Sequence, residues 1–389
     1  MDPLFATLVL ILLALLGSRF SFSTRRVPVG PRLLFRTGVH FPVLGYLLGP
    51  GGLGLLSGDA VIQLEPLLAL GLGWIGLLFG MQLDRDALRQ FPMGYHLLAL
   101  GQAALAYAFF LGIGLVLLEL ADQRSGGATL LLLGGAATAS ITTPAGVAMI
   151  SSNFLARGRV RQLLFFIASV DALVGIVALQ VAYALYHPTT PVGEIGPLPV
   201  LNWILVGVGL GVVCGIIFLW LLRPRPGREE LVLYLLGIAA LGSGAALQLQ
   251  LSPIFVCVVM GTVVANLAPD RQRIFQALEK WEKPIYVVLL LLAGALVTVP
   301  TWWVLPLAAG YIVVRAVAKW SGSALLVPLI PLPFRAPRTL GLGLIPQGGI
   351  SLALAVSVVL TYSGLTLPDG TRGVELLFAV IVLGVVVSE

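Results

Sequence analysis

Residues 138–146, Thr-Ala-Ser-Ile-Thr-Thr-Pro-Ala-Gly, interrupt an apolar run with hydroxyl side chains, a proline and a glycine. Proline removes a backbone donor and clashes with the preceding turn, so a helix through this stretch has to unwind. Residues 345–351, Ile-Pro-Gln-Gly-Gly-Ile-Ser, interrupt a second apolar run in a similar way. Discontinuous helices at corresponding places in two halves of a membrane protein mark the site of a transporter. The two stretches therefore predict a pair of broken helices that face each other at mid-membrane.

The composition around these stretches agrees with a membrane location. Of the 389 residues, 58% are hydrophobic and only 10% are charged. Soluble domains carry about 25% charged residues, so this chain cannot cover a surface that faces water. The composition excludes a soluble enzyme, a nucleic-acid reader and a disordered scaffold. We predict an all-α polytopic membrane protein that is not an enzyme and has no cofactor.

A helix needs about 20 mostly apolar residues to cross a bilayer. By this criterion we predict thirteen transmembrane helices, and no long polar segment separates them. The predicted spans lie near 3–18, 33–56, 64–82, 93–119, 127–152, 161–186, 199–222, 230–249, 252–267, 283–299, 303–328, 337–361 and 372–388.

The basic residues predict the orientation of the chain. With the amino terminus outside, 19 of the 23 lysines and arginines fall in inside loops, and 2 fall outside. We predict a multi-pass protein of the inner cell membrane. By the positive-inside rule, its carboxy terminus lies in the cytoplasm. The remaining 2, Arg315 and Lys319, lie within a span.

One acidic residue lies deep in a predicted span. Asp171 is in the middle of span 161–186, whereas the other acids lie in loops or near span ends. An intramembrane carboxylate is costly and usually marks an ion or proton path, although a structural ion pair is the alternative. Arg315 and Lys319 are four residues apart, so they share a helix face and could balance this charge. The sequence leaves open which of the two pairs with Asp171.

The two interrupted spans, 127–152 and 337–361, are the fifth and the twelfth of the predicted spans. Because they are an odd number of spans apart, they cross the membrane in opposite directions. This pattern predicts inverted repeats, with spans two to six matching spans nine to thirteen. Asp171 lies in the span that follows the first break. One carboxylate, hydroxyl groups and free carbonyls suit a hard monovalent cation, or a proton in its place.

With these features the chain resembles the cation/proton antiporter superfamily, whose fold is that of bacterial sodium/proton antiporters. Residues 45–50 (GYLLGP) and 78–84 (LFGMQLD) are similar to early signatures of the family. Thr142-Thr143-Pro144 occupies the place of Thr-Asp-Pro, and Val170-Asp171 that of Asp-Asp or Asn-Asp. Further on, Arg315 with residues 319–322 (KWSG) and residues 346–349 (PQGG) resemble runs of one antiporter branch.

The resemblance implies exchange of Na⁺, or of Li⁺ or K⁺, for H⁺, as in pH homeostasis. It also implies a homodimer and elevator-type alternating access. The scaffold and dimerisation domain would comprise 1–82 and 230–299, the ion-transporting core 93–186 and 303–388, and the linking helix 199–222.

By the same resemblance, cation and proton would compete for Asp171. The expected shell and its surroundings fall into three sets. The ion-binding set is Asp171, Thr142, Thr143, Ser140 and Ser169; the charge-compensating set is Lys319 and Arg315; the helix-break set is Pro144, Gly146, Pro346, Gln347, Gly348 and Gly349.

Val170 departs from the family pattern, because electrogenic relatives have there an acid that pairs with the buried lysine. Valine cannot ionise, so Lys319 must pair with Asp171, find another acceptor or lie neutral. The loss of one titrating acid favours an electroneutral exchange of one cation for one proton.

Three other functions remain alternatives from the sequence. One is a Kef-like K⁺ efflux domain, and another is a sodium-coupled organic-anion symporter of the bile-acid type, whose anion partner would be Arg315. The third is a membrane sensor with a decayed site. The sequence does not decide the preferred cation, the direction of transport or whether a regulatory domain accompanies the chain.

Overall fold

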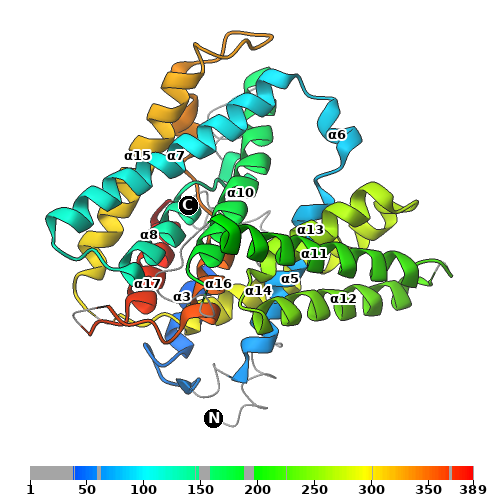
Figure 1. The fold of residues 1–389 in the computed structure, drawn as a ribbon, viewed down its shortest axis with the longest axis horizontal. Helices are drawn as coiled ribbons and strands as arrows, with labels where there is room; N and C mark the ends of the chain where they lie inside the picture. Colours follow the sequence, from blue (N-terminus) through cyan, green and yellow to red (C-terminus); the bar gives the residue numbers. More distant parts are fainter. Residues whose placement is uncertain are drawn as a thin grey trace, which may run out of the picture. The chain divides into compact units, whose positions relative to one another are not determined.

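The computed structural model describes residues 38, 40–58, 63–144, 146–148, 158–187, 197–224, 226–299, 301–367 and 370–388. This part of the chain is almost entirely helical, and its only β-type pairing is an isolated bridge between Thr366 and Arg372 (Figure 1). The predicted span 3–18 and the first residues of span 33–56 lie outside the described residues.

The apolar helices fall into two length classes. Five are long and apolar enough to cross a membrane, and a sixth span results if two helices bent by 62° are joined. The five long helices are α7 (Met93–Leu120), α10 (Arg159–Leu185), α11 (Pro197–Leu221), α12 (Arg228–Gln248) and α15 (Val304–Leu326); the bent pair is η1 (Arg338–Leu344) with α16 (Gly349–Tyr362). The shorter apolar helices are α5 (Glu65–Met81), α8 (Gly126–Ala139), α13 (Pro253–Leu267) and α17 (Gly373–Ser388).

The chain divides into two compact units. Within the described residues, unit 1 comprises 43–90 and 180–296, and unit 2 comprises 38–42, 91–179 and 297–388. Unit 1 holds most of α3 (His40–Leu48), all of α5, α6 (Arg85–Arg89) and α11 to α13, and α14 (Arg271–Ala295). Unit 2 holds α7, α8, α15, η1, α16, α17 and the part of α10 that ends at Leu179. The functional division into scaffold and transport domains stays a prediction.

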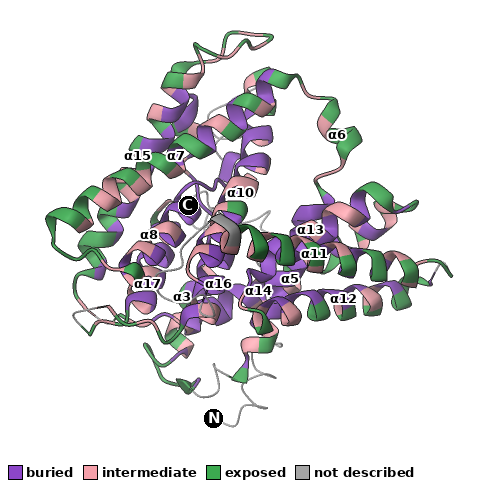
Figure 2. Ribbon diagram, viewed as in Figure 1, coloured by how far each residue is buried: buried purple, intermediate pink, exposed green. Residues whose placement is uncertain are grey.

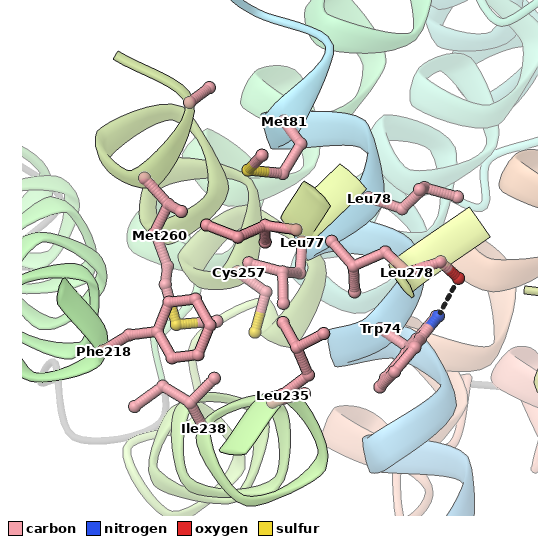
Figure 3. Close-up of a cluster of buried hydrophobic side chains, with 14 of the residues drawn as sticks. Trp74, Leu77, Leu78, Met81, Phe218, Leu235, Ile238, Cys257, Met260 and Leu278 are labelled. Carbon is pink, nitrogen blue, oxygen red and sulfur yellow. Dashed lines mark hydrogen bonds between the residues drawn. The ribbon is translucent and has the colours of Figure 1, made fainter. Parts of the chain in front are cut away.

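Unit 1 is organised around α5, which packs against α12, α13 and α14. Its centre is a cluster of buried apolar side chains that we call the unit 1 core (Figure 3). Trp74, Leu77 and Cys257 are fully buried in it, and the Trp74 indole donates a hydrogen bond to the Leu278 carbonyl over 3.3 Å. Burying apolar area stabilises such a core without any charged group.

α14 is longer than the predicted span 283–299, because it begins at Arg271 and runs through Pro284. The sequence analysis predicts this span to begin only at residue 283, so that residues 271–282, which include several charged side chains, fall outside it. In the structure, however, Ile274 and Leu278 recur at helical spacing and are buried in the unit 1 core. An amphipathic helix of this kind escapes a search for uniformly apolar spans.

Several helix faces are exposed (Figure 2), and many of the side chains on them are large and apolar. α11 is an example: Leu201, Leu205, Val213, Ile216 and Trp220 are each at least half exposed. Soluble monomers rarely leave so large an apolar stripe in water, whereas lipid tails solvate it well.

In unit 2, α15 packs against α7, η1 and α17, and α8 packs against α7, α16 and α17. These contacts bring the carboxyl end of α8 close to the start of α16. Both helix breaks thus lie within unit 2, together with the middle of α10.

Candidate functional site

Both predicted helix breaks are present in the described residues. α8 ends at Ala139, the chain is not helical at residues 140–143, and helical geometry returns at Pro144. In the second break, η1 ends at Leu344 and α16 begins at Gly349. Each break leaves backbone carbonyls without the partners that a continuous helix would supply.

The two breaks touch each other. The Thr143 amide donates a hydrogen bond to the Pro346 carbonyl over 3.2 Å. Gly146 lies against the Pro346 ring so closely that a Cβ atom on Gly146 would be 2.2 Å from the proline Cβ. Only glycine permits this approach, which explains why the first break contains Gly146 directly after Pro144 and Ala145.

Asp171, from the middle of α10, forms an ion pair with Lys319 of α15. The Lys319 Nζ lies 2.9 Å from the Asp171 Oδ2, and both side chains are completely buried. Of the two cations that the sequence left open, Lys319 is therefore the direct partner. The neighbouring position holds Val170, which is buried and cannot ionise. The described residues therefore place no second buried carboxylate beside this lysine.

The first break completes the surroundings of this pair. The Lys319 ammonium also donates to the Thr142 Oγ1 over 2.9 Å and to the Ser140 carbonyl. The Thr142 amide in turn donates to the Asp171 Oδ1 over 3.2 Å. We call the Ser140 carbonyl, the Thr142 hydroxyl and the Asp171 carboxylate the oxygen cage. The three protons of an ammonium group match these three acceptors, so Lys319 is saturated.

Arg315 has a different role from Lys319. Its two terminal nitrogens donate to the carbonyls of Ile141, over 2.6 Å, and of Ile345. These carbonyls belong to the first and the second break, respectively. The planar guanidinium can reach both at once, and the negative end of α8 lies beside it. Arg315 thus joins the two breaks, which leaves Asp171 and Lys319 as a balanced pair of charges.

A second polar layer lies next to the cage. The Gln347 amide nitrogen donates to the Thr138 carbonyl over 2.9 Å and to the Tyr311 hydroxyl over 2.6 Å. Ser351 lies within 3.4 Å of the same Thr138 carbonyl. The sequence prediction included Gln347 but missed Thr138 and Tyr311. Tyr311 could have been found, because it is one helical turn before Arg315 and therefore on the same face.

The other predicted residues contribute no side-chain atom to the oxygen cage. Ser169 donates its hydroxyl to the Phe165 carbonyl of its own helix, and the Ser140 hydroxyl bonds to the Ala137 carbonyl. Ser140 nevertheless contributes its backbone oxygen to the cage. Thr143, as described above, is engaged through its amide. Gly348 and Gly349 are buried at the start of α16.

The cage consists of oxygen atoms from a single carboxylate, one hydroxyl and one carbonyl. Such hard ligands suit alkali cations, which prefer oxygen to nitrogen or sulfur. Among the described residues, no group of three or more His, Cys, Asp or Glu residues could hold a transition metal. The oxygen atoms of the cage are of the kind that a monovalent cation or a proton can take as ligands.

Comparison with known proteins agrees with this geometry. The family described as "Sodium/hydrogen exchanger, transmembrane" matches residues 6–388. Among solved structures, the sodium proton antiporter MjNhaP1 from Methanocaldococcus jannaschii at pH 8 is 17% identical, with a TM-score of 0.68 over 100% of this chain and 96% of that one. An electron-microscopy map of the same antiporter gives 16% identity and a TM-score of 0.65, over 100% and 95% of the two chains. No curated protein matches the sequence.

Proposed function

The chain belongs to the sodium/hydrogen exchanger family, and we propose that it exchanges one monovalent cation for one proton at Asp171. The observation that carries this proposal is the buried Asp171–Lys319 pair within the oxygen cage. Membership of the family and the antiporter fold support a multi-pass membrane transporter for Na⁺ and H⁺. The role of each residue is our inference.

In the proposed cycle, the Lys319 ammonium occupies the cage when no cation is bound. An ammonium group and a dehydrated alkali cation have the same charge and accept the same oxygen ligands. A cation that enters from water displaces the ammonium from the Asp171 carboxylate, and a proton leaves the Asp171–Lys319 pair. Because the two groups interact strongly, this proton belongs to the pair rather than to either residue.

The charge count supports an electroneutral exchange. Within the described part of the chain, Asp171 is the buried carboxylate, and Arg315 and Lys319 are the buried cations. In the structure both η-nitrogens of Arg315 donate to carbonyls of the two breaks, so we assign Arg315 no part in the exchange. One cation enters as one proton leaves, so the charge of the site does not change.

The same contacts disfavour the organic-anion alternative. A symporter of that kind needs a basic group that can meet a carboxylate or sulfate. Arg315 donates both terminal nitrogens to backbone carbonyls, and Lys319 is saturated by the cage. We therefore propose Na⁺ as the substrate, with Li⁺ or K⁺ as the other candidates.

We further propose that unit 2 is the transport domain and unit 1 the scaffold, and that the protein acts as a homodimer by an elevator motion. The support for this assignment is that every cage residue belongs to unit 2. The proposed orientation has the amino terminus outside and the carboxy terminus in the cytoplasm, as the arginine distribution predicts.

The test is proton release from acid-loaded proteoliposomes that contain a pH-sensitive dye. Addition of Na⁺, Li⁺ or K⁺ to the wild type should restore the dye signal, whereas Asp171→Asn should give none. Asp86→Asn serves as the control, because it removes a carboxylate whose side chain is 70% exposed. If no cation triggers proton release in the wild type, the proposed exchange is wrong.

The stoichiometry needs a separate measurement. A potential-sensitive dye in the same vesicles should show no voltage during exchange. A voltage that builds up with the cation gradient would contradict the one-for-one exchange while leaving Asp171 as the binding group.

A further inference from the structure

α10 approaches the end of α8 very closely at Gly175. A Cβ atom on Gly175 would lie 2.7 Å from the Ala137 carbonyl oxygen and 2.7 Å from Cγ1 of Ile141. It would also lie 2.8 Å from Cδ1 of Ile141. Contacts shorter than 3.0 Å do not occur for real Cβ atoms, and a backbone oxygen cannot rotate away. The two helices can therefore be this close only with glycine at position 175.

This contact lies one helical turn from the carboxylate of the site. Asp171 and Gly175 are four residues apart on α10, so they point to the same side. On the other side of the contact, Ile141 directly precedes Thr142 in the first break. Because helical backbone moves as a rigid rod over one turn, the helix separation at Gly175 also sets the separation between Asp171 and Thr142.

That separation is one dimension of the oxygen cage. The Asp171 Oδ1 is 3.2 Å from the Thr142 amide, and the Lys319 ammonium lies 2.9 Å from both the Asp171 Oδ2 and the Thr142 Oγ1. The carboxylate comes from α10, and the other two cage oxygens come from the first break. A cation bound between them has to fit the gap that the helix contact leaves.

We propose that Gly175 determines the size selectivity of the cation site by holding Asp171 close to the first break. This inference rests on the proposed function, because it assumes that the cage binds the transported cation. A small cation such as Li⁺ or Na⁺ needs oxygens close to it, whereas K⁺ is larger and fits a wider cage. A methyl group at position 175 moves α10 away from α8, widens the cage and favours K⁺.

The experiment compares Gly175→Ala with Gly134→Ala. The control adds the same methyl group to α8, where its nearest neighbours, a Val358 methyl and a Leu377 methyl, are at ordinary distances of 3.4 and 3.7 Å. For each variant, kcat/KM for Li⁺, Na⁺ and K⁺ is measured by proton release from proteoliposomes. The midpoint of cation-dependent thermal stabilisation of the purified protein gives a second, transport-independent selectivity.

We expect Gly175→Ala to lower the Na⁺-over-K⁺ and Li⁺-over-K⁺ ratios by at least about tenfold, the range that one methylene commonly causes in a fitted pocket. Gly134→Ala should leave both ratios unchanged. An equal loss for all three cations in Gly175→Ala would indicate general damage and would overturn the proposal, and so would unchanged ratios.

A milder variant keeps the test decisive if Gly175→Ala does not fold. The double variant Gly175→Ala/Ile141→Val removes the δ-carbon of Ile141, one of the three atoms in the way, and should show a smaller shift in the same direction. The two assays also separate the two proposals. If cations stabilise the protein but release no protons, the exchange proposal is refuted, and the stabilisation midpoints still decide the selectivity proposal. If no cation gives a response in either assay, both proposals are refuted.

Discussion

The unit 1 core and the oxygen cage of unit 2 are equally well buried, yet they are held together by different forces. Trp74, Leu77 and Cys257 fill the first with apolar atoms (Figure 3). Asp171 and Lys319 occupy the second, and their burial is tolerable only because each meets the other and the break between residues 139 and 144. Apolar packing is indifferent to protons and cations, whereas a buried charge pair responds to both.

The difference shows in which region this protein tolerates buried charges, which are costly to the folded state. A buried charge costs several kcal/mol, so a structure retains it only where the charge has a use or is fully paired. All three buried residues with a formal charge in the described part of the chain lie in unit 2. The following predictions test whether the two regions differ in this way.

The largest effect is expected from breaking the buried pair. Asp171→Asn leaves the Lys319 ammonium without its counter-charge and should lower the free energy of unfolding by about 3–5 kcal/mol. The double variant Asp171→Asn/Lys319→Met removes both charges and should recover most of this loss. Thermal unfolding in detergent, followed by tryptophan fluorescence, measures both. A double variant as unstable as the single one would show that the pair is not the stabilising element.

In the unit 1 core, Leu77→Ala should cost about 3 kcal/mol, because it leaves a cavity among fully buried neighbours. Leu77→Met, which conserves volume, should cost less than about 1.5 kcal/mol. Neither variant should change the KM for the cation, provided that transport is measured well below the unfolding temperature. A shift in KM would mean that the core is coupled to the cage and would weaken the contrast.

A smaller effect should follow from Arg315→Lys. The charge stays, but a lysine cannot bridge the carbonyls of Ile141 and Ile345 with the fixed geometry of a guanidinium. Loss of one hydrogen bond from a charged group should lower the free energy of unfolding by about 1.5–3 kcal/mol. Arg372→Lys is the control, since that side chain is 72% exposed and its replacement should leave the free energy of unfolding nearly unchanged. Equal costs at the two positions would show that Arg315 does not join the breaks.

The smallest effect concerns pH. If a proton and a cation compete for the Asp171–Lys319 pair, each unit of pH below the midpoint of the pair raises the KM for the cation by up to about tenfold, or about 1.4 kcal/mol, without lowering kcat. Leu77→Ala should show the same pH dependence as the wild type. A KM that is independent of pH while kcat falls would argue against competition.

Much of the site could be predicted from the sequence, because its signals are local. Pro144 and Pro346 mark the breaks through the backbone chemistry of proline. Asp171 is conspicuous because carboxylates are rare in the middle of an apolar span. The fold class follows from the same apolar runs, although the amphipathic start of α14 was missed because charged residues flank Ile274 and Leu278 on both sides.

The rest depends on distances between segments far apart in the chain. Helical spacing shows that Arg315 and Lys319 share a face of α15, but it cannot tell which of them reaches Asp171. Likewise, spacing does not reveal that the Ser169 hydroxyl bonds within its own helix, or that Ser140 contributes its carbonyl to the cage.

The sequence by itself determined that this protein is an all-helical membrane protein with two broken helices and one deep carboxylate, since apolar runs, proline and a lone acid act through local physics. Only the tertiary structure decided that Lys319 pairs with Asp171 and that Arg315 joins the two breaks. The reason is that helix packing sets which side chains meet. Here the close approach of Gly175 to Ala137 and Ile141 brings α10, which carries the carboxylate, against the end of α8.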